Sequence, residues 1–317
     1  MIRLFNINNY VIDTSKFNNF LHDEIVTDFE NKFKSYVGAK YACSLNSATN
    51  AIFLSFVGKN VCPNIPSVIP PVVVNAVVTS GNEFKFSDNI DWVGNSYVLH
   101  EFTDYKIVDS AQKVEKNQFK KECNSQDLMI FSFYPTKPIG SCDGAMIVSD
   151  DWEKIKWFKE MALNGMSYAE NNWEREIKYP GFKMYMNSIQ AYIAKENFNR
   201  LDEKKEKLKE IRDVYNKELG YTNISDHLYR IEVSDNKKFI MMMLEKDIVC
   251  GIHYEALHLN DVYKELNLAN RDNYENLIYP NSEKICNRTV SIPFHENLTL
   301  EETDKVLNNI YKILELL

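Results

Sequence analysis

Short apolar runs alternate with amphipathic helical patterns along most of the chain, and this alternation limits the possible folds more than any other feature. Residues 40–45, "KYACSL", and 105–111, "YKIVDSA", have the pattern of buried strands. Residues 23–37 instead place apolar side chains at helical spacing, and Gly38 ends that pattern. Because strands that alternate with helices build a sheet covered by helices, we expect an α/β chain.

The pattern changes after the longest helical stretch, residues 187–219, whose apolar stripe faces alternating charges. Strand, helix and strand patterns follow, and then a final helix that opens on the capping-box pair Thr299 and Glu302. This change predicts two lobes. We expect a large domain over residues 1–210 and a smaller C-terminal α/β domain over residues 211–317.

Composition excludes several classes of protein. The chain has 317 residues, 44% of them hydrophobic, and a net charge of −8, which argues against a nucleic-acid or anionic-membrane partner. No apolar run approaches the roughly 20 residues that span a bilayer, and the start lacks a signal-peptide pattern. Six scattered cysteines without a C-x-x-C pair indicate reduced thiols, a cytoplasmic location and no metal site.

One lysine lies in a segment with little conformational freedom, "FSFYPTKPIGSCDGAMIVS" at residues 131–149. Pro135 and Pro138 flank Lys137, and strand-like runs precede and follow the segment. Burying a lysine is costly unless it is paired or chemically converted. Lys137 is therefore either a hairpin-tip residue that points to water or a residue with a chemical role.

Three further stretches carry polar groups at positions suited to a ligand. "NSATNA" at residues 46–51 joins a strand to a helix, where free N–H groups favour an anion. Asp109 ends an apolar strand, Gln112 lies three residues later, and Ser132 precedes Lys137 by five residues. Each alone has an ordinary explanation, such as a helix cap. Together they supply what pyridoxal phosphate requires: a lysine, a carboxylate for the pyridinium nitrogen, and groups that hold a phosphate.

In their order and spacing these stretches resemble the DegT/DnrJ/EryC1/StrS family of pyridoxal-phosphate-dependent sugar aminotransferases. "FENKFKSYVGAKYACSLNSATNAI", "VDSAQ", "SFYPTKPIGSCDGAMIVS" and "PGFKMYMNSIQAYIAKENFNRLD" are similar to family motifs, as are "GIHYEALH" and "RTVSIPFHENLTLEETDKV". The resemblance implies fold type I, the aspartate-aminotransferase architecture. That architecture has a large domain with a mostly parallel central sheet flanked by helices and a smaller C-terminal domain.

The resemblance also implies roles for single residues. Lys137 would be the catalytic lysine that forms the Schiff base and moves protons, and Asp109 would bind the pyridinium nitrogen. Gln112 would contact the phenolic side of the cofactor ring. The implied phosphate-binding residues are Ser47, Ala48, Thr49 and Ser132.

The implied substrates are a nucleotide-linked keto-deoxysugar and an amino-acid donor, for which we expect glutamate, in the synthesis of surface polysaccharide or glycan precursors. The implied working unit is a homodimer with shared active sites. Residues 165–187 contain aromatics and positive charge but no helical or strand period, so we expect them to lie over a neighbouring subunit. A plain surface loop is the alternative interpretation.

Several positions depart from the family pattern. Val74 stands where an aromatic residue usually stacks on the cofactor, Tyr185 where asparagine is more frequent, and Ala256 where proline is common. Residues 95–109 are also short, as if a crossover helix before Asp109 were missing. These departures keep a second hypothesis open, a divergent member with a non-sugar substrate or a binding role. The dehydratase branch of the family has histidine in place of the lysine, so Lys137 argues against it.

Overall fold

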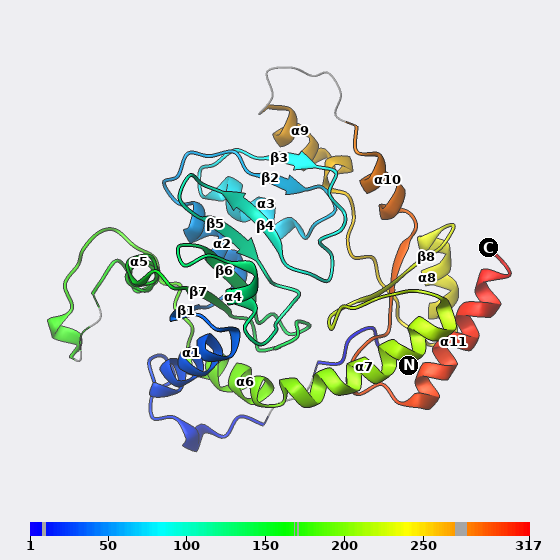
Figure 1. The fold of residues 1–317 in the computed structure, drawn as a ribbon, viewed down its shortest axis with the longest axis horizontal. Coiled ribbons are helices and arrows are strands. Elements are labelled where there is room, and N and C mark those ends of the chain that lie inside the picture. Colours follow the sequence, from blue (N-terminus) through cyan, green and yellow to red (C-terminus); the bar gives the residue numbers. More distant parts are fainter. Residues whose placement is uncertain (8–10, 168, 170, 270–277) are drawn as a thin grey trace.

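A five-stranded sheet forms the centre of the larger lobe in the computed structural model, which describes residues 1–7, 11–167, 169, 171–269 and 278–317 (Figure 1). In spatial order its strands are β1 (Tyr41–Leu45), β7 (Ala145–Ser149), β6 (Leu128–Ser132), β5 (Lys106–Asp109) and β4 (Tyr97–Glu101). β5 and β6 run parallel, and the other neighbours are antiparallel.

The predicted two-lobed α/β architecture is confirmed, but this sheet is mixed rather than mostly parallel. Parallel neighbours need a crossover of about a dozen residues or more, usually a helix. Only residues 102–105 join β4 to β5, so these strands can only pair as a hairpin. As predicted, β4 leads to β5 and Asp109 without a crossover helix between them. Residues 133–144 likewise turn back from β6 to β7 without a helix.

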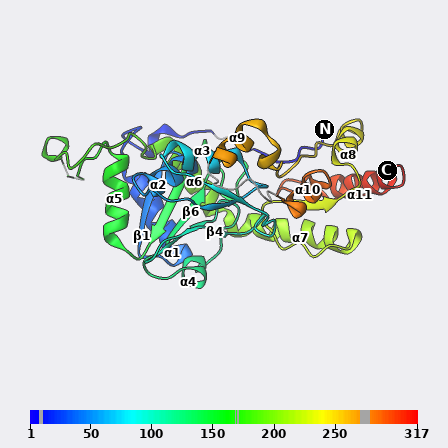
Figure 2. The same cartoon turned by 90° about the horizontal axis from the view of Figure 1, so that it is seen from above.

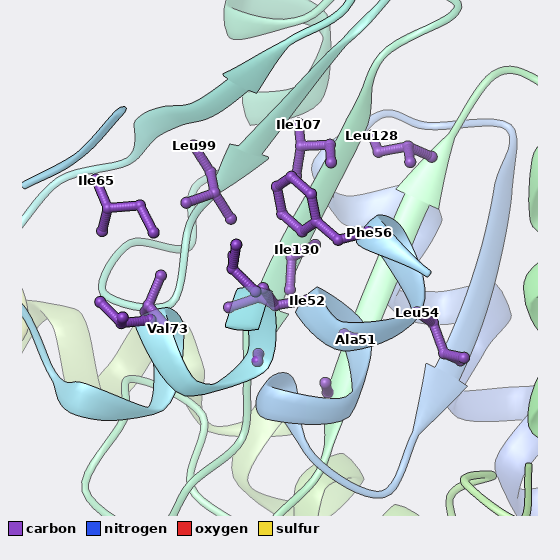
Figure 3. Close-up of a cluster of buried hydrophobic side chains, with 14 of the residues drawn as sticks. Ala51, Ile52, Leu54, Phe56, Ile65, Val73, Leu99, Ile107, Leu128 and Ile130 are labelled. Carbon is purple, nitrogen blue, oxygen red and sulfur yellow. The ribbon is translucent and has the colours of Figure 1, made fainter. Parts of the chain in front are cut away.

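Helices cover both faces of the sheet because its strands alternate their side chains between two cores. Leu128 and Ile130 of β6 point to one core, and Met129 and Phe131 point to the other. The first core contains α2 (Ala48–Phe56), α3 (Pro71–Thr79) and α5 (Trp152–Ala162), and Figure 3 shows part of it. The second contains α1 (Glu24–Val37), α4 (Gln118–Glu122) and α6 (Ser188–Asn199).

The smaller lobe extends from one end of the larger one and has its own core (Figure 2). Its elements are α7 (Leu201–Leu219), β8 (Tyr229–Glu232), α8 (Asn236–Leu244), β9 (Thr289–Ile292) and α11 (Leu300–Leu314). β8 and β9 form an antiparallel pair, and Ile2 packs into the same core. We propose a domain boundary near residue 210, inside α7, with the first residues of the chain joined to the small lobe.

Several short regular elements lie outside the five-stranded sheet and the core of the small lobe. They are β2 (Asn64–Pro66), β3 (Lys85–Ser87), α9 (Asp261–Ala269), α10 (Pro280–Cys286) and 3₁₀ turns at Thr14–Lys16, Asn172–Glu174 and Leu257–Leu259. Residues 246–254, expected to be a strand, make only single bridges, Ile248 with Ile2 and Gly251 with Ser291. None of the helices in the described ranges has the length and apolar character needed to cross a membrane.

The segment between α5 and α6 projects away from the body of the molecule (Figure 1). Bridges between Leu163 and Lys183 and between Met166 and Ile177 hold its two arms together. Among the described residues of this segment, Trp173 at 83% and Ile177 at 74% exposure are the most exposed large hydrophobic side chains. Water-exposed apolar side chains of this size on a projecting segment are typical of a contact with another chain.

Candidate active site

Lys137 lies in the tight connection between β6 and β7. The N–H of Phe133 donates to the carbonyl of Gly144 at 2.8 Å, which closes the connection on itself. A Cβ atom on Gly140 would lie 2.4 Å from the carbonyl oxygen of Pro135, so a larger residue does not fit there. The prolines and this glycine therefore fix the backbone that carries Lys137.

The side chain of Lys137 lines a cavity of about 360 Å³ together with Asp109. Burial lowers the pKa of Lys137 to about 8, and the charge of Asp109 acts in the opposite direction. Burial also raises the pKa of Asp109, whereas its hydrogen bonds and the charge of Lys137 oppose that rise. An amine with a pKa this close to neutrality is available in its unprotonated, nucleophilic form.

Asp109 is held at the carboxyl end of β5 by two donors. Its Oδ1 accepts from the N–H of Ala111 at 2.9 Å, and its Oδ2 accepts from the hydroxyl of Tyr97 at 3.0 Å. Tyr97 lies directly opposite Asp109 in the β4–β5 hairpin. With only 4% of its surface exposed, this carboxylate has a fixed orientation.

Gln112 is also held from two sides. Its Oε1 accepts from the N–H of Gly94 at 2.7 Å, and its Nε2 donates to the hydroxyl of Tyr254 at 3.0 Å. Gln112 lines the same cavity as Asp109 and Lys137. The structure thus brings these three sequence-predicted residues together.

The predicted phosphate-binding residues lie at the start of α2 and the end of β6. Ala48, Thr49 and Ser132 line the cavity. Ser47 instead acts as the N-cap of α2, because its Oγ accepts from the N–H of Asn50 at 3.2 Å. A helix N-terminus that opens on a cavity favours an anionic group there.

Aromatic and imidazole side chains that sequence reasoning did not assign complete the cavity wall. They come from the N-terminal segment, the large lobe and the small lobe: Phe5, Trp92, Tyr134, His227, His253 and Tyr254. The ring of Trp92 stacks on that of Tyr254, with centroids 5.9 Å apart and planes 4° apart. Burial, with a smaller contribution from the charge of Lys137, lowers the pKa of both His227 and His253, the latter to about 4. Both imidazoles are therefore neutral at neutral pH.

A weak signal for two of these residues is present in the sequence. Trp92 is a lone large aromatic in the polar run "NIDWVGNS", and Tyr254 lies in the family-like stretch "GIHYEALH". His227 and Phe5 have no such signal, because they join the cavity wall from segments that are far from the large-lobe residues along the chain.

The three departures from the family pattern lie outside the cavity wall. Val74 is fully buried in the first core, whereas its neighbour Val73 lines the cavity. The ring of Tyr185 lies 4.3 Å from that of His22, and Ala256 bridges Val68. Trp92, from another segment, places an aromatic ring in the cavity wall.

The residues around this cavity fit pyridoxal phosphate. A lysine whose pKa is lowered and a buried carboxylate face one space, and a helix N-terminus with two hydroxyl side chains opens on that space. These are the amine, the anion and the phosphate donors that the cofactor requires. Across the described parts of the chain there is no cluster of metal-ligating side chains.

Comparisons with known proteins agree with this geometry. The model of the DegT/DnrJ/EryC1/StrS aminotransferase family matches residues 5–88 and 105–311. A UDP-4-amino-4,6-dideoxy-N-acetyl-beta-L-altrosamine transaminase of Campylobacter jejuni is 27% identical over 360 residues, covering 93% of each chain.

Two solved structures have the same fold, and they confirm the predicted fold class. The Helicobacter pylori aminotransferase PseC, involved in the biosynthesis of pseudoaminic acid, has a TM-score of 0.78 at 18% identity and covers 99% of this chain and 100% of its own. The putative sugar aminotransferase Spr1654 of Streptococcus pneumoniae, in its PLP form, has a TM-score of 0.78 at 18% identity and covers 98% of each chain.

Proposed function

The chain belongs to the DegT/DnrJ/EryC1/StrS aminotransferase family, and from this premise we propose that it is a pyridoxal-phosphate-dependent sugar aminotransferase. It moves an amino group from an amino acid to a keto group of a nucleotide-linked deoxysugar. The observation that carries the proposal is the pairing of Lys137 and Asp109 in one cavity, each shifting the pKa of the other.

Each residue of the site has a distinct task in this proposal. The cofactor, when bound, supplies an electron sink for charge that develops at the carbon from which a proton is removed. Asp109 keeps a proton on the cofactor ring nitrogen by its negative charge. Lys137 Nζ would remove the proton from Cα of the amino donor in the first half-reaction and deliver a proton to the sugar carbon that receives nitrogen in the second. Thr49, Ser132 and the N–H groups of α2 bind the phosphate, and Gln112 contacts the ring.

The substrates follow from the relatives. The name of the Campylobacter jejuni relative supports a nucleotide-linked amino-deoxysugar as the product class. We propose glutamate as the amino donor and surface-polysaccharide or glycan precursors as the destination. We also propose that the enzyme works in the cytoplasm, since all six of its cysteines are free thiols.

The working unit proposed here is a homodimer in which each site is completed by the other subunit. The segment between α5 and α6, which projects from the body of the molecule, supports this, because it carries the exposed side chains of Trp173 and Ile177. A groove lined by α1, α5 and this segment offers a second surface, and it contains Lys34, Trp152 and Lys156.

Reduction with borohydride tests the assignment of the lysine. After incubation with pyridoxal phosphate, peptide mass spectrometry should find a pyridoxyl group on the peptide that contains Lys137, and Lys137→Ala should carry none. Lys183→Ala is the control and should keep the adduct. An adduct that persists in Lys137→Ala would identify another lysine as the nucleophile.

Activity is tested by incubating the protein with glutamate and a panel of nucleotide-linked keto-sugars and reading the products by mass spectrometry. A mass change that corresponds to replacement of a keto group by an amine supports the proposed reaction. A protein that binds the cofactor and aminates none of the sugars would instead favour the divergent, non-sugar hypothesis.

A further inference from the structure

The family match leaves out residues 89–104, and this stretch contacts both polar ring-binding residues of the site. It contains Trp92, Gly94 and Tyr97, the first residue of β4. Tyr97 donates to Asp109, and Gly94 donates to Gln112. A stretch outside the family match therefore contacts two residues, Asp109 and Gln112, whose roles the family resemblance implies.

The position of Tyr97 follows from the hairpin. Because β4 pairs antiparallel with β5, Tyr97 lies directly opposite Asp109 in the register. Burial, followed by the charge of Asp109, raises the pKa of Tyr97 well above its ordinary value, so the hydroxyl keeps its proton and acts as the donor. A carboxylate that accepts such a bond is stabilised in its charged form.

A series of contacts fixes the ring of Tyr97 in turn. Its centroid lies 5.0 Å from that of Trp92. The indole N–H of Trp92 donates to the carbonyl of Val68 at 3.2 Å, and its ring stacks on Tyr254. The hydroxyl of Tyr254 accepts from Gln112, so Tyr97 is attached to a rigid wall that includes both cofactor-facing residues.

We propose that Tyr97 is a positioning residue for the amino-transfer reaction: its hydroxyl fixes the plane of the Asp109 carboxylate and keeps that carboxylate ionised. The proposal rests on the proposed function for its catalytic consequence. The groups that face Asp109 are Tyr97 from β4, Lys137 from the β6–β7 connection and Tyr254 from the small lobe. In the described structure, Tyr97 is the one of these three residues that donates a hydrogen bond to the side chain of Asp109.

Tyr97→Phe removes the hydroxyl and keeps the ring, so it tests the donor without opening the core. Tyr105→Phe, in the same hairpin, is the matched control, because the ring of Tyr105 stacks on Phe102 instead, with centroids 4.6 Å apart. The first measurement uses cofactor-free protein labelled with ¹³C at aspartate Cγ, with the Asp109 signal assigned by its loss in Asp109→Asn. Tyr97→Phe should raise the midpoint of the Asp109 titration by about one pH unit, and Tyr105→Phe should leave it unchanged.

The second measurement uses the holoenzyme. Tyr97→Phe should weaken cofactor binding by about tenfold and lower kcat by about tenfold, while KM for the amino donor changes less than twofold, because the negative charge that would hold the ring-nitrogen proton is lost in part. The acid limb of the visible absorption titration should move upward with the Asp109 midpoint.

The outcomes separate this proposal from the proposed function. An Asp109 titration in Tyr97→Phe that matches that of the wild-type chain overturns the role of Tyr97, whatever the enzyme does. If the Asp109 titration shifts in Tyr97→Phe but the wild-type protein binds no pyridoxal phosphate, the role of the Tyr97 hydroxyl is supported and the proposed function is overturned. Thermal unfolding of the cofactor-free variants should stay within a few degrees of wild type, and a large loss would mean that the hydroxyl supports the fold rather than the carboxylate.

Discussion

Lys137 and Asp109 oppose the effect of burial on each other. Burial favours the neutral form of both groups, whereas each charge favours the charged form of the other. The lysine pKa of about 8 is the balance that results in the cofactor-free cavity. Each of the two groups therefore sets part of the protonation equilibrium of the other.

Competitive acetylation of the cofactor-free protein at a series of pH values should show Lys137 reacting with a midpoint near pH 8. Asp109→Asn should lower that midpoint further, because the charge that raises the lysine pKa is removed. Mass spectrometry of the peptides reports the extent of labelling, and Lys217, with 84% of its side chain exposed, serves as the reference. A midpoint that stays the same in Asp109→Asn would mean that the two groups do not interact.

Asp109→Ala should lower transamination at least 100-fold, which corresponds to about 2.7 kcal/mol of lost transition-state stabilisation. The reason is that Asp143, the other carboxylate among the described residues lining the cavity, lacks the bonds from Tyr97 and Ala111 that hold Asp109. Steady-state kinetics with glutamate and the accepted sugar measure the loss, and Asp143→Ala is the matched control. Near-normal turnover in Asp109→Ala would contradict the assignment.

Elements that depend on neighbouring residues could be predicted from the sequence, and those that depend on distant ones could not. Gly38 ends α1 in the left-handed conformation, and Thr299 and Glu302 form the predicted capping box of α11. The pairing of Tyr97 with Asp109 depends on the register of the hairpin, which the turn and the irregularity between Val98 and His100 set and which the alternation of side chains alone does not reveal. Residues 246–254 are a similar case. They do not form a strand because they bridge only the distant residues Ile2 and Ser291.

The long helical pattern is a second such case. It is divided at Arg200 into α6, which packs with α1, and α7, whose Leu208, Ile211 and Tyr215 face the small lobe. A sequence stripe shows that a helix is amphipathic but not that its two halves serve different cores.

Ser47→Ala should lower the free energy of unfolding by about 1 kcal/mol, because the N-cap of α2 is lost. It should also weaken pyridoxal phosphate binding by about fivefold, since the first turn of α2 faces the cavity and its N–H groups become less ordered. Thr299→Ala removes the equivalent cap of α11, far from the cavity, and should reproduce only the loss of stability. Urea unfolding and cofactor titration measure the two effects, and equal cofactor affinity in both variants would exclude α2 as the phosphate site.

Among the described residues, two large cores lie in the large lobe, one lies in the small lobe, and residues of both lobes line the cavity. The projecting segment between α5 and α6 is the part least integrated into either lobe (Figures 1 and 2). For the whole molecule we therefore predict that this segment lies in the dimer interface.

Light scattering should give about twice the 37.1 kDa chain mass for the wild-type protein. Trp173→Ser with Ile177→Ser should shift the equilibrium toward monomer, because the most exposed apolar surface of the segment is removed. Val11→Ser, 92% exposed at another site, is the control and should leave the mass unchanged. We propose that Lys183 of this segment acts in the site of the other subunit, so mixing inactive Lys137→Ala chains with inactive Lys183→Ala chains should restore some activity. A fully active monomer would overturn the dimer.

Ile2, near the start of the sequence, packs into the small lobe, most of which is synthesised after the large lobe. The N–H of Ile2 donates to the carbonyl of Asp247 at 2.7 Å, and the N–H of Val249 donates to the carbonyl of Ile2 at 2.9 Å. At a synthesis rate of about 5–20 residues per second, Ile2 waits roughly ten to fifty seconds on the ribosome before its partners emerge. During that time the large lobe can fold, but the cavity still lacks His253 and Tyr254 on its wall. The cavity wall can therefore be completed only late in synthesis, after most of the large lobe has left the ribosome.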